Sequence, residues 1–190
     1  MDLTLALPAP EHLPGMTRAL KRGWSPDNLR PETAAEALAK IVEDPAGYLA
    51  ALDDPEARAG DITLPDGSKV ERLPGTHRFL WDGDFCGVIG LRWARGGAGL
   101  PAHVPGHIGY AVVPWKRQRG YATRALALTL PLARDQGLSF VDLTTDEDNI
   151  ASQRTILANG GRLVGRFTKP VALGGAQSLK YRIALDSGAL

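Results

Sequence analysis

Basic residues cluster in the middle of the chain, in the run 116–119 that leads to Gly120. The segment before this run, 108–113, is apolar and rich in β-branched residues, which predicts a buried strand that ends at Pro114. Apolar residues at helical spacing follow from 120 to 136. The first N–H groups of a helix have no partner within the helix, and its dipole favours negative charge there. The segment therefore predicts an anion site at a strand–turn–helix.

A second helix start follows further along the chain. Asn149 is suited to cap a helix that carries Ser152 in its first turn. This helix is predicted to end at Asn159-Gly160-Gly161 in left-handed backbone geometry, and a strand is predicted over 162–167.

Both segments match motifs of a known family. Arg117-Gln-Arg-Gly120-Tyr-Ala122 fits the pattern R/Q-x-x-G-x-G/A and directly follows the strand end Val112-Val113-Pro114. It resembles the acyl-CoA-binding motif of the GNAT superfamily of N-acyltransferases, and the segment from Asn149 resembles the family's N-x-x-S/A…G segment. The resemblance covers 77–167 and implies an α/β (α+β) fold. Such a fold has a mixed, mostly antiparallel central sheet flanked by helices, with the acyl-CoA site at the strand–turn–helix.

The resemblance also implies how acetyl-CoA, the co-substrate, is held. Amides of 118–123 would bind the pyrophosphate, and the backbone of the strand end would pair with the pantetheine arm, with a Val112 N–H facing the thioester oxygen. Asn149 and Ser152 would contact the pantetheine arm. The residues so assigned are Val112, Val113, Arg117, Gln118, Arg119, Gly120, Tyr121, Ala122, Thr123, Asn149 and Ser152.

Acyl transfer to an amine also needs proton transfer. An alkyl ammonium of pKa about 10.4 is mostly charged at neutral pH, so a base or a water relay assists. His107, at the start of the predicted strand, is the leading candidate because imidazole titrates near neutrality. A carboxylate is the commoner base in such enzymes, which makes Asp142, Asp146 and Glu147 alternatives.

The acid that protonates the leaving thiolate is harder to assign. Many GNAT enzymes have a tyrosine seven residues after the asparagine, and this chain has Ile156 there. Ser152 is our candidate for the catalytic acid; Thr145, Tyr121 and water are alternatives, and a CoA thiolate is itself a tolerable leaving group.

The remaining elements follow from local patterns. Helices are predicted over 13–22, 33–43 and 45–52, the second with Thr33 and Glu36 at capping-box spacing. Strands are predicted over 77–81, 85–93, 140–145 and 179–185, with a hairpin turn at 82–84. A turn at 65–67 indicates a small hairpin or an ordered loop. Pro131 should kink or end the helix that starts near Gly120.

The chain has 190 residues, which suits one domain: a helical and loop part to about 75, an acyl-CoA-binding core over 76–168, and a closing strand over 169–190. A net charge of +1 gives no case for nucleic acid or an anionic membrane. The single cysteine, Cys86, excludes an internal disulfide and is compatible with a cytoplasmic protein. His103 and His107 lie four apart without further ligands, so no metal is expected. A homodimer is compatible with the fold.

Three other functions are alternatives to acyl transfer. A dinucleotide-binding fold requires Gly-x-Gly-x-x-Gly after a strand, and this is absent. A non-catalytic acyl-CoA-binding or sensor protein on the same fold is the alternative that the missing tyrosine keeps open, and a protein-interaction module is a further one. The acceptor is a small-molecule amine or a protein amine, and the sequence does not identify it.

Overall fold

The structure is a computed structural model that describes residues 2–28, 30–63, 67–97, 99–101, 103–169 and 175–185. The N-terminal elements are β1 (Thr4–Ala6), η1 (Pro10–His12), α1 (Leu13–Lys21), α2 (Thr33–Glu43), α3 (Pro45–Leu52) and β2 (Asp53–Asp54). The predictions for α2 and α3 are confirmed to the residue, and α1 is one residue shorter than predicted. The strands β1 and β2 were not predicted, because each is too short to show an alternating pattern.

The later elements carry the predicted anion site. They are β3 (Ile62–Thr63), β4 (Lys69–Val70), β5 (Gly75–Trp81), β6 (Phe85–Arg92), η2 (Arg95–Gly97), β7 (Ile108–Val112), η3 (Pro114–Lys116), α4 (Tyr121–Asp135), β8 (Phe140–Asp146), α5 (Ile150–Ala158), β9 (Arg162–Thr168) and β10 (Gln177–Ala184). The predicted order of strand, turn, helix, strand, helix and strand from 108 to 167 is confirmed. The small hairpin is formed by β3 and β4, although Pro65 and Asp66 of its predicted turn lie outside the described residues.

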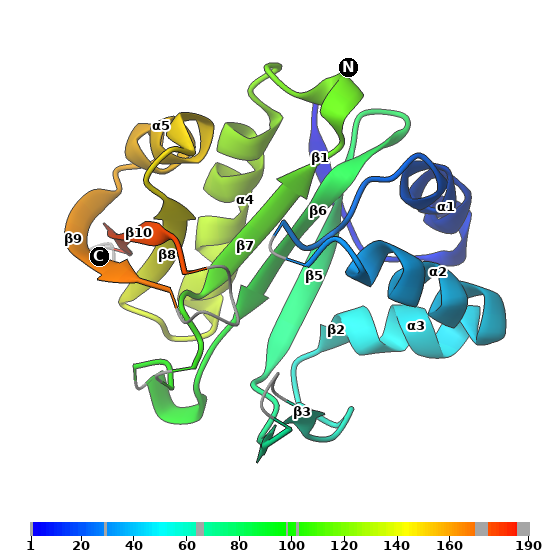
Figure 1. Cartoon of the computed structure of the whole chain (residues 1–190), viewed down its shortest axis with the longest axis horizontal. Coiled ribbons are helices and arrows are strands. Elements are labelled where there is room, and N and C mark those ends of the chain that lie inside the picture. The colour runs from blue at the N-terminus through cyan, green and yellow to red at the C-terminus, as the bar shows by residue number, and fades with distance from the viewer. Residues whose placement is uncertain are drawn as a thin grey trace.

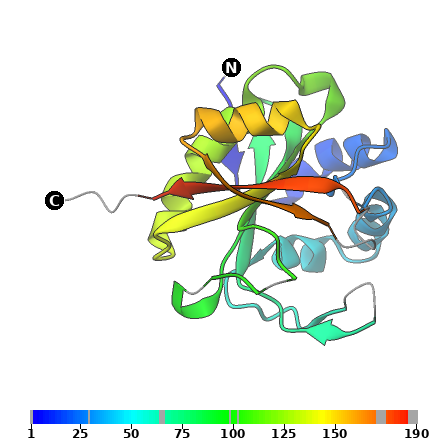
Figure 2. The same ribbon diagram turned by 60° about the vertical axis from the view of Figure 1, so that its left-hand side comes forward.

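Two sheets and a small ribbon make up the β structure. The first sheet has the order β1-β5-β6-β7, with β2 also paired to β5, and the second has the order β8-β10-β9. Every pairing is antiparallel. The predicted class, a mixed α/β protein with mostly antiparallel sheet and flanking helices, is confirmed (Figure 1). The single central sheet expected from the sequence is divided between β7 and β8, and Figure 2 turns the second sheet toward the viewer.

The two sheets meet at one end of β7. The His107 N–H donates to the Asp142 carbonyl oxygen at 2.7 Å, and the Asp142 N–H donates to His107 Nδ1 at 2.9 Å. A side chain on Gly106 would lie 2.9 Å from the same carbonyl oxygen, so the close approach requires glycine there. Beyond this junction, the described residues show no further backbone hydrogen bond between β7 and β8.

Helices cover both faces of the first sheet (Figure 1). On one face, α1 buries Leu13, Met16 and Leu20, at helical spacing, against the side of β5 and β6 that carries Phe79 and Phe85. On the other face, α4 and α5 pack through a second apolar cluster that extends under the second sheet. No helix among the described residues is long and apolar enough to cross a bilayer.

One local prediction is wrong. The capping box at Thr33 is not formed, because Glu32 is the N-cap residue and the Thr33 hydroxyl donates to the Arg30 carbonyl oxygen. Of the two outcomes expected at Pro131, a kink or an end of the helix, the end does not occur, because α4 continues to Asp135. Ala127, whose carbonyl a proline at 131 leaves without its usual donor, is exposed, so water can hydrate that carbonyl.

Candidate functional site

The turn between β7 and α4 has the backbone geometry of an anion site. Gln118 and Gly120 have positive φ angles of 61° and 73°, and Gly120 is the N-cap residue of α4, with no capping side chain. The first helical hydrogen bond runs from the Arg124 N–H to the Gly120 carbonyl oxygen at 3.0 Å, so the N–H groups of 121–123 have no partner within the helix. A side chain on Gly120 would meet nothing within 4 Å, so this helix end is open to a ligand.

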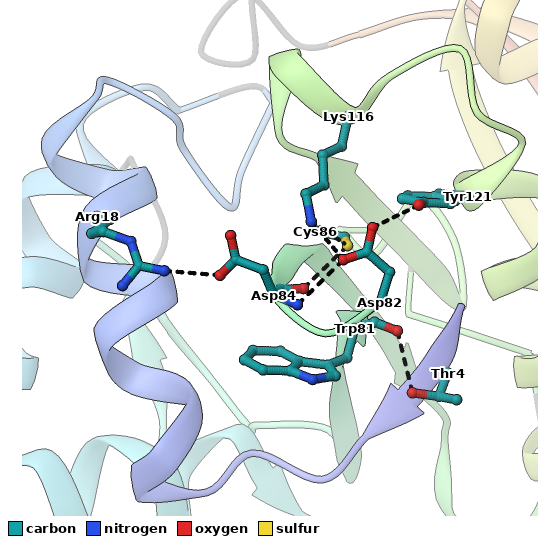
Figure 3. Close-up of polar contacts among 8 residues, drawn as sticks. All are labelled: Thr4, Arg18, Trp81, Asp82, Asp84, Cys86, Lys116 and Tyr121. Carbon is teal, nitrogen blue, oxygen red and sulfur yellow. Dashed lines mark hydrogen bonds and ion pairs between the residues drawn. The ribbon is translucent and has the colours of Figure 1, made fainter. Parts of the chain in front are cut away.

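A partly buried carboxylate, that of Asp82, fixes this turn to the β5–β6 hairpin (Figure 3). Asp82 Oδ1 accepts from Lys116 Nζ at 2.6 Å, and Asp82 Oδ2 accepts from the Tyr121 hydroxyl at 2.6 Å. The side chains of Asp82 and Lys116 are each 12% exposed. Burial alone would raise the pKa of Asp82, but the hydrogen bonds from Lys116, Tyr121 and other neighbours outweigh it and hold that pKa well below its usual range. The sequence assigned 82–84 to a hairpin turn and gave Asp82 no role in the site.

The contacts of Asp82 separate Lys116 from the other two basic residues of the run 116–119. Lys116 neutralises Asp82 and is not available to a ligand. Arg117 and Arg119 are exposed, and neither has a carboxylate within ion-pair distance among the described residues. Arg117 Nε donates to the Val112 carbonyl oxygen at 3.2 Å, which places this guanidinium beside the end of β7. The local positive charge next to the helix N-terminus therefore comes from Arg117 and Arg119.

The register of β7 determines which of its backbone groups are available. The Arg92 N–H donates to the His107 carbonyl, and the Val113 N–H donates to the Cys86 carbonyl at 2.9 Å. Because antiparallel pairing alternates, the backbone groups of Tyr110 and Val112 point away from β6. The Val112 N–H has the orientation that the oxyanion role requires. The Val113 N–H, in contrast, belongs to the sheet and cannot pair with a pantetheine arm.

The facing edge of β8 is available in the same way. Pairs with β10 place the hydrogen bonds of Ser139 and Glu147 on the side away from β7. Alternation then directs the backbone groups of Thr144 and Asp146 toward β7, although the Asp146 carbonyl oxygen accepts from the Asn149 N–H at 3.1 Å. Beyond the junction of His107 with Asp142, the facing edges of β7 and β8 are thus not paired with each other among the described residues.

The start of α5 lies beside both strands. Asn149 Oδ1 accepts from the Ser152 N–H at 3.1 Å, so Asn149 caps the helix as the sequence predicted. Ser152 Oγ lies 2.8 Å from the hydroxyl of Tyr110, a residue that the sequence analysis did not single out. Burial raises the pKa of Tyr110, so its phenol is protonated at neutral pH. The contact joins β7 to α5, and its two residues are 42 positions apart in sequence, so no local pattern predicts it.

The hydrogen bonding of His107 does not suit a general base. The side chain is 2% exposed, and its Nδ1 accepts the Asp142 N–H at 2.9 Å. The proton of the neutral ring must then be on Nε2, which leaves no lone pair for an incoming proton. Burial lowers the pKa of His107 and keeps the ring neutral. The structure thus places His107 at the junction of the two sheets.

The alternative carboxylate bases are all paired with cations. Asp142 accepts two hydrogen bonds from Arg182 at 2.7 and 3.0 Å, Asp146 forms an ion pair with Lys169, and Glu147 forms one with Arg166 at 3.2 Å. For Asp142 and Asp146, burial acts to raise the pKa, but the hydrogen bonds lower it below the usual range. Paired carboxylates of low pKa are weak proton acceptors.

The structure also reduces the number of candidates for the acid that protonates the thiolate. Ile156 is fully buried, and the Tyr121 hydroxyl is held by Asp82. The Thr145 hydroxyl is buried and has no hydrogen-bond partner among the described residues. Ser152 lies beside β7 through its contact with Tyr110. No group of three or more His, Cys, Asp or Glu residues in the described part of the chain is arranged to hold a metal ion.

Comparison with known proteins assigns the family. The model of the acetyltransferase (GNAT) domain matches residues 2–162. The chain therefore belongs to the GNAT acetyltransferase family and is an acetyl-CoA-dependent N-acetyltransferase. No curated protein matches the sequence significantly.

Solved structures share the fold at low sequence identity. RimL, a ribosomal L7/L12 α-N-protein acetyltransferase solved with coenzyme A, has a TM-score of 0.61 at 15% identity, over 98% of this chain and 96% of its own. MccE, the microcin C7 self-immunity acetyltransferase solved with acetyl-CoA and AMP, has a TM-score of 0.60 at 14% identity, over 96% and 92%. The aminoglycoside acetyltransferase AAC(6')-Ib, solved with coenzyme A and kanamycin, has a TM-score of 0.58 at 15% identity, over 96% and 95%.

Proposed function

We propose that this protein transfers the acetyl group of acetyl-CoA to a primary amine by direct attack in a ternary complex. The observation that carries the proposal is the uncapped N-terminus of α4 beside β7, the last strand of its sheet, whose Val112 N–H points away from β6. The acceptor is a small-molecule amine or a protein amine. Both classes occur among the proteins of similar fold, since RimL is a protein acetyltransferase and AAC(6')-Ib was solved with kanamycin.

The proposed acetyl-CoA site follows from these two features, the N-terminus of α4 and the edge of β7. The N–H groups of 118–123, at the start of α4, would bind the pyrophosphate, with Arg117 and Arg119 adding positive charge. The pantetheine arm would enter the opening between β7 and β8 and pair with strand edges as an added strand does. In this arrangement the Val112 N–H faces the thioester oxygen and stabilises the oxyanion. Asn149 and Ser152 contribute from the start of α5.

The proton transfers would be divided between water and one hydroxyl pair. The amine nitrogen attacks the thioester carbon, the carbon–sulfur bond breaks, the nitrogen loses a proton and the thiolate gains one. With His107 and the carboxylates engaged elsewhere, water receives the proton of the amine. The hydroxyl pair of Tyr110 and Ser152 supplies the proton to the thiolate, in place of the tyrosine that Ile156 replaces.

Titration calorimetry with acetyl-CoA, CoA and NADH tests the donor site. We expect saturable binding of the two CoA compounds and none of NADH. Gly120→Glu should weaken acetyl-CoA binding at least a hundredfold, because it places bulk and negative charge at the phosphates. Gly137→Glu is the matched control: Gly137 lies at the other end of α4, with a φ of 76° and similar open space. Equal affinities for the two variants would refute the site.

A further inference from the structure

The face of the first sheet that α1 and α2 cover changes character at one end. Phe79, Val88 and Ala111 are cross-strand neighbours and form an apolar row under these helices. The next row along the same face contains two glycines, because His77 pairs with Gly90 and Gly90 with Gly109. The apolar packing stops here, and the sheet presents a floor without side chains across β6 and β7.

A neutral histidine lies over the first of these glycines. A side chain on Gly90 would lie 2.8 Å from Nε2 of His77, so the ring rests on this glycine. His77 Nδ1 is 3.0 Å from the Leu52 carbonyl oxygen, which can only accept, so Nδ1 carries the proton. Burial lowers the pKa of His77, and the ring stays neutral with the lone pair of Nε2 available.

A guanidinium lies over the second glycine. Arg92 Nη2 would be 3.7 Å from a side chain on Gly109. Arg92 is exposed to solvent, and burial of part of its surroundings lowers the pKa of the guanidinium. Asp27, from the connection between α1 and α2, acts on it electrostatically, but no ion pair joins Arg92 to a carboxylate among the described residues. A guanidinium above a floor without side chains and without such a pair has its planar fork available to a bound carboxylate.

We propose that Arg92, above the Gly109 floor and beside the neutral His77, binds a carboxylate of the amine acceptor. The inference rests on the proposed function, and it names the class of acceptor: a primary amine that also carries a carboxylate. The floor faces α1 and α2, whereas α4 lies on the opposite face, so acceptor and donor approach the free edge of β7 from different sides (Figure 1).

The position of the floor sets the length of this acceptor. Gly109 is three residues before Val112, whose N–H marks the place of acetyl transfer, and three residues of strand span roughly 10 Å. An amine at Val112 and a carboxylate at Arg92 therefore belong to an extended molecule, such as one with a chain of about six carbons, whether a free amino acid or part of a peptide.

The test compares 6-aminohexanoate with 6-amino-1-hexanol, which has the same chain length and no charge, and with the shorter 4-aminobutanoate. We expect kcat/KM for 6-aminohexanoate to exceed that for both other amines, and to exceed that for the amino alcohol by about ten- to a hundredfold, because a hydrogen-bonded charge pair contributes that much. Arg92→Gln should remove this preference, and Arg92→Lys, which keeps the charge without the planar fork, should retain part of it. Arg134→Gln, on the exposed side of α4, is the matched control and should retain all of it.

The outcomes separate the two proposals. Equal rates for 6-aminohexanoate and 6-amino-1-hexanol, including undetectable rates for both, would overturn the carboxylate site while leaving acetyl-CoA binding intact. A preference that survives in Arg92→Gln would do the same. Loss of acetyl-CoA binding in the unmodified protein, measured by calorimetry on the same sample, would instead overturn the proposed function.

Discussion

At the scale of single residues, the site depends on a carboxylate that does not touch a ligand. Asp82 connects the β5–β6 hairpin to η3 and to the first residue of α4, through partners 34 and 39 residues away. The carboxylate of the neighbouring Asp84 forms an exposed ion pair with Arg18, whose side chain is 64% exposed (Figure 3). The two aspartates flank one glycine, so their different roles come from the fold and not from their sequence context.

Asp82→Asn should lower the free energy of unfolding by about 2–3 kcal/mol, since it leaves the charge of Lys116 partly buried without a counterion. Chemical denaturation measures this change. Because the pKa of Asp82 is lowered in the folded state, its stabilisation is present above the unfolded pKa of about 3.9 and is lost as the pH falls through the folded value. The variant should lack this acid-induced loss. Asp84→Asn should change the free energy of unfolding by less than about 1 kcal/mol. Equal changes in the two variants would contradict the role of Asp82 in holding η3 and α4 to the hairpin.

Tyr110→Phe tests the hydroxyl pair. We expect kcat to fall by about ten- to a hundredfold, because the thiolate loses its proton donor, while the Kd for acetyl-CoA changes little. Steady-state kinetics and calorimetry give the two values. Tyr48→Phe is the control, because the Tyr48 hydroxyl contacts only Met16 Sδ at 3.7 Å, under α1. An unchanged kcat in Tyr110→Phe would exclude the pair as the acid.

At the scale of elements, local signals predicted several features around the proposed site. The strand end at Pro114, the Asn149 cap and the left-handed Gly160 each depend on neighbours in sequence, and the structure shows all three. The cap at Thr33 failed because the backbone turn around Arg30 offered the hydroxyl another acceptor. Asp82 and Tyr110 could not be found in this way, since their partners are distant in sequence.

Pro131→Ala examines the unusual proline in α4. The proline removes a helical hydrogen bond, and packing of Leu126 and Ala133 against the core holds the helix in spite of that loss. We expect the alanine variant to be more stable by about 1–2 kcal/mol, less than the full cost of about 3 kcal/mol for a helix-interior proline, because a proline also restricts the unfolded chain. Thermal unfolding checks the sign, and a destabilised variant would show that Pro131 makes contacts that alanine cannot replace.

At the scale of the whole molecule, the sequence predicted one central sheet, whereas the structure has two. Strand patterns show which segments are extended, but pairing between β7 and β8 is decided by residues that are far apart in sequence. His107 and Asp142 hydrogen-bond at one end, and Tyr110 turns to Ser152 on α5 at the other. The break in pairing between β7 and β8, where we propose that the pantetheine arm binds, therefore arises from how the two halves of the fold meet.

His107→Gln separates the role of His107 at this junction from a role in catalysis. Loss of the buried contact with Asp142 should lower the free energy of unfolding by about 2–4 kcal/mol. Because burial lowers the pKa of His107, the unfolded chain binds more protons just below its own pKa of about 6.5, so wild-type stability falls as the pH drops through that value. Denaturation at several pH values should show a weaker fall in the variant, with part remaining from His77, whose pKa is also lowered. His103→Gln, at an exposed position, should leave the curve unchanged. The pH profile of kcat/KM should keep its shape in His107→Gln; loss of an ionisation near neutrality from that profile, with stability intact, would return His107 to the role of general base.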